Sequence, residues 1–254
     1  NDTLSCRLFY QFHSIDGFVV FKDERILHAV KQMSQKPDQA VIFDMDGVLT
    51  DSEPLINEAS VKMFAELGVQ VQPEDFYPYV GTGEKHYIGG VAEKYGMRID
   101  LFEAKMRVYE IYLKLAPRKL RSFPGAVELV HRCRDQGWKI GVASSADMIK
   151  IEANMTQIGL PLETWDAVTG ADHVEHKKPA PDIFLAAAKQ LEVMSNQCVV
   201  IEDASHGVQA AKSAGMRCVA VTHTFSADQL AQADLIKETV GKIQLTDLFP
   251  CEAS

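Results

Sequence analysis

The stretch Val41-Ile42-Phe43-Asp44-Met45-Asp46-Gly47-Val48-Leu49-Thr50-Asp51 indicates the fold of this chain. Three apolar residues lead directly into two carboxylates one residue apart, and a glycine follows. A short apolar run that ends at a turn is typical of a buried strand. Because open α/β sheets bind ligands at the C-terminal ends of their parallel strands, we expect Asp44 and Asp46 to lie at a ligand site.

The rest of the chain alternates helical and strand-like segments. Apolar residues recur at helical spacing over about 55–67, 85–95 and 101–115 without strand-like alternation, which predicts a helical module over residues 53–118. Beyond residue 123, helices alternate with predicted strands over 138–143, 167–169, 198–201, 217–221 and 233–236. This alternation is typical of an α/β fold with a parallel sheet. We therefore expect an α/β core of residues 38–52 and 119–254 and an N-terminal extension of residues 1–37, with a short strand over 18–21 and helical spacing over 26–33.

Composition excludes several classes of partner. The 254 residues include 26 Lys and Arg against 35 Asp and Glu, a net charge of −9. A chain this acidic is not expected to bind nucleic acid or a membrane surface, whereas binding of a small phosphorylated ligand depends on local charge only. Five cysteines without a CxxC pair are typical of free thiols in a reducing compartment, and no apolar run approaches the ~20 residues of a bilayer span. We expect a soluble intracellular protein.

Chemically active side chains stand at the ends of three predicted strands. Parallel strands place their C-terminal ends on one edge of the sheet, so these side chains can converge. Four acids, serine hydroxyls and an ammonium are typical of a magnesium and phosphate site, because Mg²⁺ prefers oxygen ligands and phosphoryl transfer needs charge neutralisation. The residues are Asp44 and Asp46, Ser144 and Ser145, Glu202 and Asp203, with Lys178 from the loop Lys177-Lys178-Pro179.

Each residue has a role that follows from its expected position. Asp44 can contact the metal and attack phosphorus to form an aspartyl-phosphate, with Lys178 and Mg²⁺ offsetting the repulsion between carboxylate and phosphate. Asp46, in the following turn, can protonate the leaving oxygen and later accept a proton from water. The expected metal ligands are Asp44, Asp46, Glu202 and Asp203, and the expected phosphate-binding residues are Ser144, Ser145 and Lys178.

Each part of this pattern also has a purely structural explanation. A lone pair of acids with this spacing is commonly a turn or a cap, a serine at a strand end commonly caps a helix, and a single lysine is commonly a solvated surface charge. The joint occurrence of all the parts, each at a strand end or in an adjacent loop, favours the functional explanation.

At these motifs the chain resembles the haloacid dehalogenase (HAD) superfamily, in the branch with a helical cap that includes CbbY-like proteins, β-phosphoglucomutases and phosphoglycolate phosphatases. The resemblance implies a Rossmann-like core, a small α-helical cap domain over residues 53–118, Mg²⁺ as cofactor and an aspartyl-phosphate intermediate. Its motifs are Asp44-Met45-Asp46-Gly47-Val48-Leu49-Thr50-Asp51, Ala143-Ser144-Ser145, Lys178-Pro179-Ala180-Pro181-Asp182 and Val200-Ile201-Glu202-Asp203-Ala204-Ser205-His206-Gly207.

The run from Gly81 to Lys85, with Gly89-Gly90 after it, resembles the HAD domain of plastid proteins from plants and algae. The resemblance implies a cytoplasmic location, or the plastid stroma if the source is a plant or an alga.

Two positions distinguish this chain from the phosphomutases of that branch. Those enzymes carry a histidine where this chain has Ile56, and a phosphate-gripping arginine about where Glu84 stands. A mutase must hold a second phosphate while the sugar turns over. We therefore expect hydrolysis of a small phosphate monoester, either a sugar phosphate or a nucleotide-like compound. The core motifs contact only the phosphate, so Glu84 and Lys85 of the cap are expected to contact the substrate.

Two alternatives stay open, a β-phosphoglucomutase-like phosphomutase and a non-catalytic regulatory HAD domain such as those fused to larger proteins. A Schiff base at Lys85, as in phosphonoacetaldehyde hydrolases, is disfavoured because those enzymes lack an acid at the position of Asp46. The expected partner is a small phosphorylated metabolite, and the chain is expected to be a monomer or a weak dimer.

Overall fold

The computed structural model describes residues 14–15, 18–19, 38–81 and 83–250. The chain divides into two units, residues 1–37 and residues 38–254. In the first unit, strands β1 (Ser14–Ile15) and β2 (Phe18–Val19) pair antiparallel. The rest of the strand predicted over 18–21 and the helical spacing of residues 26–33 lie outside the described residues.

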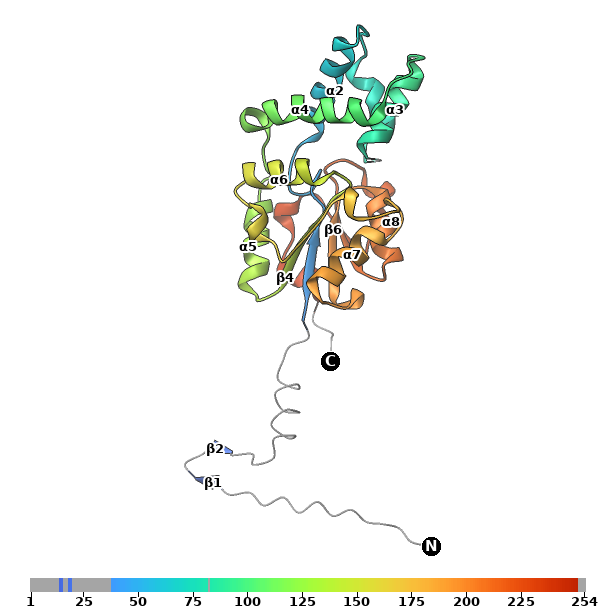
Figure 1. Ribbon diagram of the computed structural model, residues 1–254. Coiled ribbons are helices and arrows are strands. Elements are labelled where there is room, and N and C mark those ends of the chain that lie inside the picture. The colour runs from blue at the N-terminus through green and yellow to red at the C-terminus, as the bar shows by residue number, and fades with distance from the viewer. Residues whose placement is uncertain (1–13, 16–17, 20–37, 82, 251–254) are drawn as a thin grey trace. The chain divides into compact units, whose positions relative to one another are not determined.

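The second unit is built on a six-stranded sheet whose paired strands are all parallel (Figure 1). The α/β fold predicted from the sequence is therefore confirmed. Strand β3, which carries the opening stretch, lies inside the sheet and pairs with β4 on one side and β6 on the other. In spatial order the strands are β5 (Ala167–Thr169), β4 (Lys139–Ala143), β3 (Ala40–Phe43), β6 (Cys198–Glu202), β7 (Arg217–Val221) and β8 (Leu235–Lys237).

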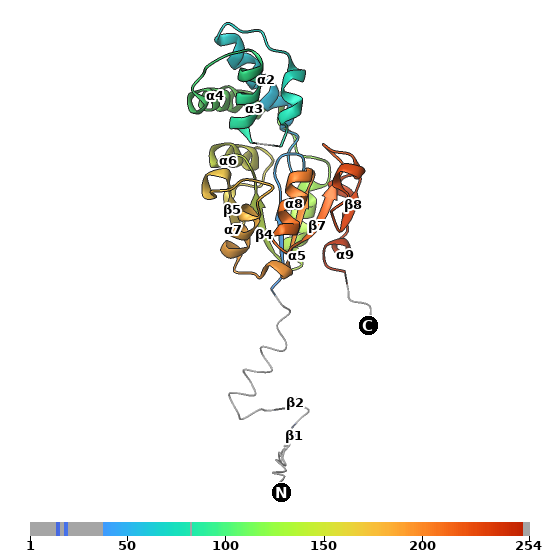
Figure 2. The same cartoon turned by 90° about the vertical axis from the view of Figure 1, so that its right-hand side faces the viewer.

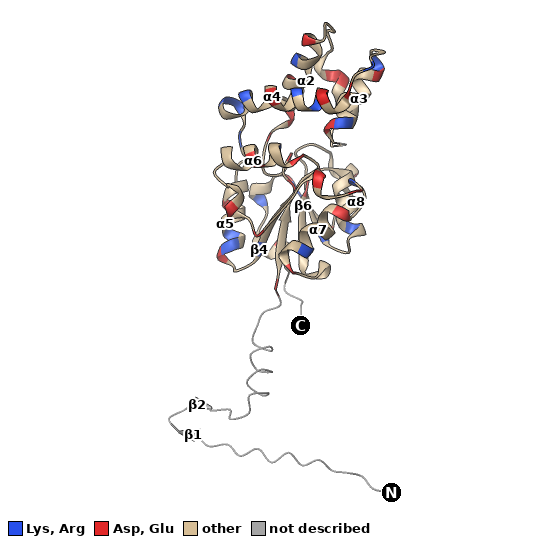
Figure 3. Cartoon of the chain, in the orientation of Figure 1, with Lys and Arg blue, Asp and Glu red and all other residues tan. Residues whose placement is uncertain are grey.

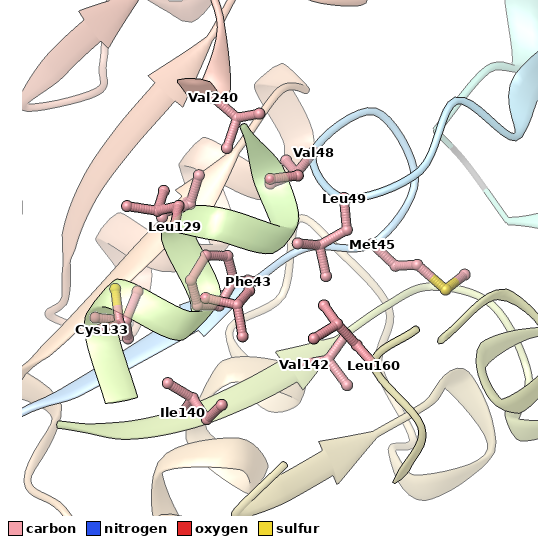
Figure 4. Packing of buried hydrophobic residues seen from close by; sticks show 14 of the residues in the cluster. Phe43, Met45, Val48, Leu49, Leu129, Cys133, Ile140, Val142, Leu160 and Val240 are labelled. Carbon is pink, nitrogen blue, oxygen red and sulfur yellow. The ribbon is translucent and has the colours of Figure 1, made fainter. Parts of the chain in front are cut away.

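Helices cover both faces of the sheet, so alternate residues of β3 enter two apolar layers (Figure 2). Val41 and Phe43 pack with α5 (Ala126–Asp135) and α6 (Met148–Gln157), and Figure 4 shows Phe43 among residues of this layer. Ala40 and Ile42 pack with α7 (Asp182–Leu191) and α8 (Ser205–Ser213). The short helix α9 (Leu245–Leu248) follows the last strand. Burial of both faces of β3 explains why this strand is an unbroken apolar run.

Residues 53–119 form a helical layer with an apolar cluster of its own, called the cap below (Figure 1). It contains α2 (Glu53–Glu66), the 3₁₀ segment η1 (Pro73–Tyr79), α3 (Glu84–Lys94) and α4 (Leu101–Lys119). The predicted third helix stopped at Leu115, yet α4 continues through Pro117. The buried Leu120 explains this, because its backbone N–H donates to the Ala116 carbonyl and closes the last turn.

In the view of Figure 3, Lys and Arg as well as Asp and Glu are spread over the helices of the second unit. Within the described part of the chain, no helix combines the length and the apolar character that crossing a bilayer requires.

Candidate active site

The C-terminal ends of β3, β4 and β6 meet at one edge of the sheet, because these strands are parallel neighbours. Backbone hydrogen bonds from Asp44 N–H to Ile201 O (2.9 Å) and from Ser144 N–H to Thr169 O (3.0 Å) continue the pairing beyond the strands. Between this edge and the cap lies a pocket with about 730 Å³ of empty space, part of it open to solvent. It is lined by all the predicted site residues except Lys85, namely Asp44, Asp46, Glu84, Ser144, Ser145, Lys178, Glu202 and Asp203.

Lys178 links the ends of two strands. Its buried ammonium donates to Oδ1 of Asp44 (2.5 Å) and to Oε1 of Glu202 (2.7 Å). Oε2 of Glu202 accepts from the backbone N–H groups of Asp203 (2.7 Å) and Ala204 (2.8 Å). The sequence predicted Glu202 as a metal ligand. In this structure one of its oxygens is engaged by Lys178 and the other by the backbone.

Three buried carboxylates share this edge with that one ammonium. Burial, with Glu202 nearby, raises the pKa of Asp44 to about 8 in spite of the opposing effect of Lys178. Burial and the neighbouring Glu202 and Asp44 also hold the pKa of Asp203 well above its ordinary value. Burial alone would lower the pKa of Lys178, but Asp44 and Glu202 outweigh it and keep this ammonium charged. The edge therefore holds more carboxyl groups than cations, and a further cation would favour the ionised form of these carboxyls.

The donor chemistry of this edge fits Mg²⁺. The Asp44 and Asp203 carboxylates are hard oxygen donors, and the pKa of each is raised. No complete cluster of three or more Asp, Glu, His or Cys side chains arranged for a metal is found among the described residues. A site of two carboxylates still suits Mg²⁺, which usually keeps several of its waters. Asp44 and Asp203 are thus the residues that would hold it.

Asp46 has partners on both of its oxygens. Oδ1 accepts from the Ser52 hydroxyl, and Oδ2 accepts from the Lys150 ammonium at 2.9 Å. Lys150 also reaches Oε1 of Glu84 in the cap at 3.4 Å, and its side chain is 4% exposed. Sequence reasoning missed Lys150, although Lys150 and Asn154 stand four residues apart on the buried face of a predicted helix, where two polar side chains are unusual.

Glu84 and Lys85, both predicted to contact substrate, have different placements. Glu84 is buried and lines the pocket, whereas Lys85 is exposed and does not. Consecutive residues of a helix point about 100° apart, so only one of the two can face the core. The ammonium on this side of the pocket belongs to Lys150 instead.

The structure adds three residues that the sequence pattern did not single out. Glu53, at the start of α2, lines the pocket and is hydrogen-bonded to the Tyr87 hydroxyl. Tyr87 lines the pocket from α3. Thr224 lines it after β7 and is hydrogen-bonded to Asp203. Spacing within one helix gave no signal for these residues, because their relevance depends on elements far apart in the chain.

The arrangement is suited to nucleophilic displacement at phosphorus. Asp44 offers a carboxylate, and Lys178 offers charge neutralisation beside it. Asp46, two residues further on, is an acid in the same pocket. The Ser144 oxygen accepts from the Ala146 N–H (3.1 Å), which leaves the Ser144 O–H free to donate to a bound oxygen atom.

Comparison with known proteins agrees with this geometry. Residues 41–221 match the haloacid dehalogenase-like hydrolase family. Hexitol phosphatase B of Escherichia coli (strain K12) is 31% identical over 198 residues, which are 72% of this chain and 82% of that protein. The crystal structure of CbbY from Rhodobacter sphaeroides in complex with phosphate has a TM-score of 0.76 at 28% identity, covering 83% of this chain and 99% of that one.

A plant protein is also similar. Protein SUPPRESSOR OF QUENCHING 1, chloroplastic, of Arabidopsis thaliana is 51% identical over 215 residues, which are 83% of this chain. The chain spans only 20% of the length of that protein. The resemblances predicted from the motifs, to CbbY-like proteins and to a plastid protein, are confirmed.

Proposed function

The chain belongs to the haloacid dehalogenase-like hydrolase family, and from this premise we propose that it hydrolyses a small phosphate monoester through a phosphorylated Asp44. As a phosphatase-type hydrolase of that family, it acts on phosphorylated compounds. The observation that carries the proposal is the Lys178 ammonium held between Asp44 and Glu202 at the end of β3. This contact sets a carboxylate and a cation side by side where a phosphate would enter.

In the first step, a carboxylate oxygen of Asp44 attacks phosphorus and the bond from phosphorus to the leaving oxygen breaks. The Asp46 carboxyl gives its proton to that oxygen, so the alcohol leaves as a neutral molecule. Lys178 and the Ser144 hydroxyl donate to the phosphoryl oxygens, whose charge would otherwise repel the nucleophile. The product on the protein is an acyl phosphate at Asp44.

In the second step, water attacks the phosphorus of this acyl phosphate. Asp46, now a carboxylate, takes a proton from the water, and the Asp44 carboxylate is released together with inorganic phosphate. Bound between Asp44 and Asp203, Mg²⁺ would supply charge neutralisation at the phosphoryl oxygens. Glu202 keeps Lys178 in place during both steps, because its two oxygens join this ammonium to the backbone.

Asp44→Asn tests the proposal, because it keeps the shape of the side chain and removes the nucleophile. We expect the wild type to release phosphate from p-nitrophenyl phosphate with Mg²⁺ present, and the variant to fall below about a thousandth of that rate. The matched control is Asp38→Asn, an exposed acid before the start of β3, which should keep the wild-type rate. An Asp44→Asn variant as active as the wild type would contradict the proposed nucleophile.

The same assays separate the two alternatives. A phosphomutase would isomerise a sugar phosphate without releasing phosphate. The buried Ile56 and the acid Glu84 in the pocket favour hydrolysis over that reaction, because a mutase must hold a second phosphate. A regulatory domain would bind Mg²⁺ and turn over no member of a broad panel of phosphate monoesters. This alternative has support from the much greater length of the Arabidopsis relative.

We further propose a plastid location for the chain. Its 51% identity to a protein named as chloroplastic supports this location over the cytoplasm. Expression of a fluorescent fusion of the full-length protein in its source cells tests it. Fluorescence confined to the cytosol would contradict the proposal.

A further inference from the structure

The charged residues that line the pocket divide into two groups. The described lining includes six carboxylates and two ammonium groups. At the sheet edge, Lys178 contacts Asp44 and Glu202, with Asp203 beside them. Toward the cap, Lys150 contacts Asp46 and Glu84, and Glu53 completes the lining. The first group and Asp46 belong to the proposed phosphoryl transfer, whereas Glu53 and Glu84 face the part of the substrate that does not react.

The second group, called the acidic wall below, consists of three carboxylates around the Lys150 ammonium, which already has two carboxylate partners. Its acids come from three places: Glu53 begins α2, Glu84 begins α3, and Asp46 follows β3. The Lys150 ammonium comes from α6 and lies 2.9 Å from Oδ2 of Asp46 and 3.4 Å from Oε1 of Glu84. It also lies 5.6 Å from the centre of the buried Tyr112 ring. Asp46 and Glu84 hold the pKa of Lys150 well above its ordinary value in spite of burial, so this cation stays charged and paired.

We propose that this acidic wall makes the protein specific for compounds with one phosphate and an uncharged, hydroxyl-rich leaving group. Glu84 excludes a second phosphate in two ways: its own negative charge repels the phosphate, and its ion pair with Lys150 keeps that ammonium from binding the phosphate. The inference rests on the proposed phosphatase function and adds the class of substrate. A second phosphate dianion would meet Glu53 and Glu84, and like charges in a partly enclosed pocket repel strongly. Hydroxyl groups suit the same wall, because carboxylates accept their hydrogen bonds.

Another cation stands near the pocket and serves as the competing explanation. Lys177 is exposed and does not belong to the described lining, but an added Cβ at Gly83 would lie 3.2 Å from its ammonium. A second phosphate at the mouth of the pocket would meet Lys177 instead of the acidic wall. The Lys177→Gln variant therefore distinguishes selection at the mouth from selection by Glu84.

Competition assays test the inference without requiring that the competing compound be a substrate. Hydrolysis of p-nitrophenyl phosphate is followed in the presence of fructose 6-phosphate or of fructose 1,6-bisphosphate, which differ by one phosphate. For the wild type, we expect the bisphosphate to inhibit more weakly than the monophosphate, with an inhibition constant at least about tenfold larger. Because charge repulsion is screened by salt, this difference should shrink as NaCl is raised. The salt measurement needs no variant and stands even if a variant folds poorly.

Glu84→Gln removes one negative charge and releases Lys150 from one partner. The bisphosphate should then compete about tenfold better relative to the monophosphate. Glu93→Gln is the matched control, since it makes the same change at an exposed position of the same helix and should leave the ratio unchanged. Adding Lys150→Met to Glu84→Gln should remove part of the gain, because the released cation is then absent.

Four outcomes overturn the inference. The first is a wild type that binds both compounds equally, and the second is a Glu84→Gln variant with an unchanged ratio. The third is a ratio that responds to Lys177→Gln and not to Glu84→Gln. The fourth is a wild type with which neither sugar phosphate competes. In all four, p-nitrophenyl phosphate is still hydrolysed and the proposed function stands. A wild type that releases no phosphate from any of the three compounds would overturn the proposed function and this inference together.

Discussion

Asp44 and Asp46 are separated by one residue, yet their carboxyl groups have different partners. Asp44 continues the direction of β3 and meets Lys178, whereas Asp46 lies in the following turn and meets Ser52 and Lys150. The turn needs Gly47, whose φ of +84° is open to glycine at little strain, and an added Cβ would lie 1.8 Å from Oδ2 of Asp203. One glycine thus lets two neighbouring acids take separate roles.

Glu53 gives a prediction about pH. Burial raises the pKa of its carboxyl from 4.5 to about 6, although Lys150 and the Tyr87 hydroxyl act in the opposite direction. Because the folded-state pKa is raised, folding favours the protonated form. The stabilising contribution is complete below the ordinary pKa of 4.5 and is lost as the pH rises through about 6. Glu53→Gln, which resembles the protonated carboxyl, is expected to stabilise the chain at pH 8 by at most about 2 kcal/mol, and by less at pH 5.

Urea unfolding at the two pH values measures this difference in the free energy of unfolding. Glu93→Gln, at an exposed position of α3, should change little at either pH. Destabilisation by Glu53→Gln at pH 8, or a gain that is as large at pH 5, would show that burial does not penalise the ionised carboxyl.

Helices α4 and α6 join the cap to the core. Lys105 of α4 pairs with Asp147, which precedes α6, and Tyr112 of α4 donates to Oδ1 of Asn154 in α6 at 2.7 Å. Both groups of the second contact are buried. Lys150 lies on α6 between these contacts. The position of the cap and the position of the Lys150 ammonium beside Asp46 therefore both depend on how α4 packs on α6.

The buried hydrogen bond between Tyr112 of α4 and Asn154 of α6 gives a prediction about stability. Tyr112→Phe keeps the ring and removes the donor to Asn154, so it is expected to lower the free energy of unfolding by about 1–3 kcal/mol. The control is Tyr77→Phe, whose side chain is 63% exposed and should change stability by less than about 0.5 kcal/mol. Urea denaturation measures both. Equal effects of the two substitutions would argue against a stabilising role for the contact between α4 and α6.

At the scale of the whole molecule, the fold holds carboxylates together that repel one another. Mg²⁺ binds the folded chain at Asp44 and Asp203 in our proposal, so added Mg²⁺ should raise the Tm. Asp203→Asn removes a carboxylate whose pKa is held well above its ordinary value. This variant is expected to have a higher Tm than the wild type without metal and to lose most of the response to Mg²⁺.

Thermal unfolding with and without about 10 mM Mg²⁺ measures both effects, with Asp135→Asn, an exposed acid of α5, as the control. If Asp203→Asn kept the full wild-type rise in Tm, the metal would have to be held elsewhere.

The sequence by itself determined the α/β class and the set of acids, hydroxyls and ammonium groups at the sheet edge. Helical and strand-like spacing is a local property, and parallel strands present the same end to the same edge in whatever order they pair. The apolar run before Asp44 and the one before Glu202 were therefore enough to predict that these two carboxylates would lie near each other.

Only the tertiary structure decided the order of the strands and the second half of the pocket. Lys150 meets Asp46 across 104 positions of sequence and Glu84 across 66. Glu84 faces the pocket while Lys85 does not, and Glu202 engages Lys178. The physical reason is the same in each case. The direction in which a helical or loop side chain points is set by how its element packs on the others, and no pattern within a single element carries that information.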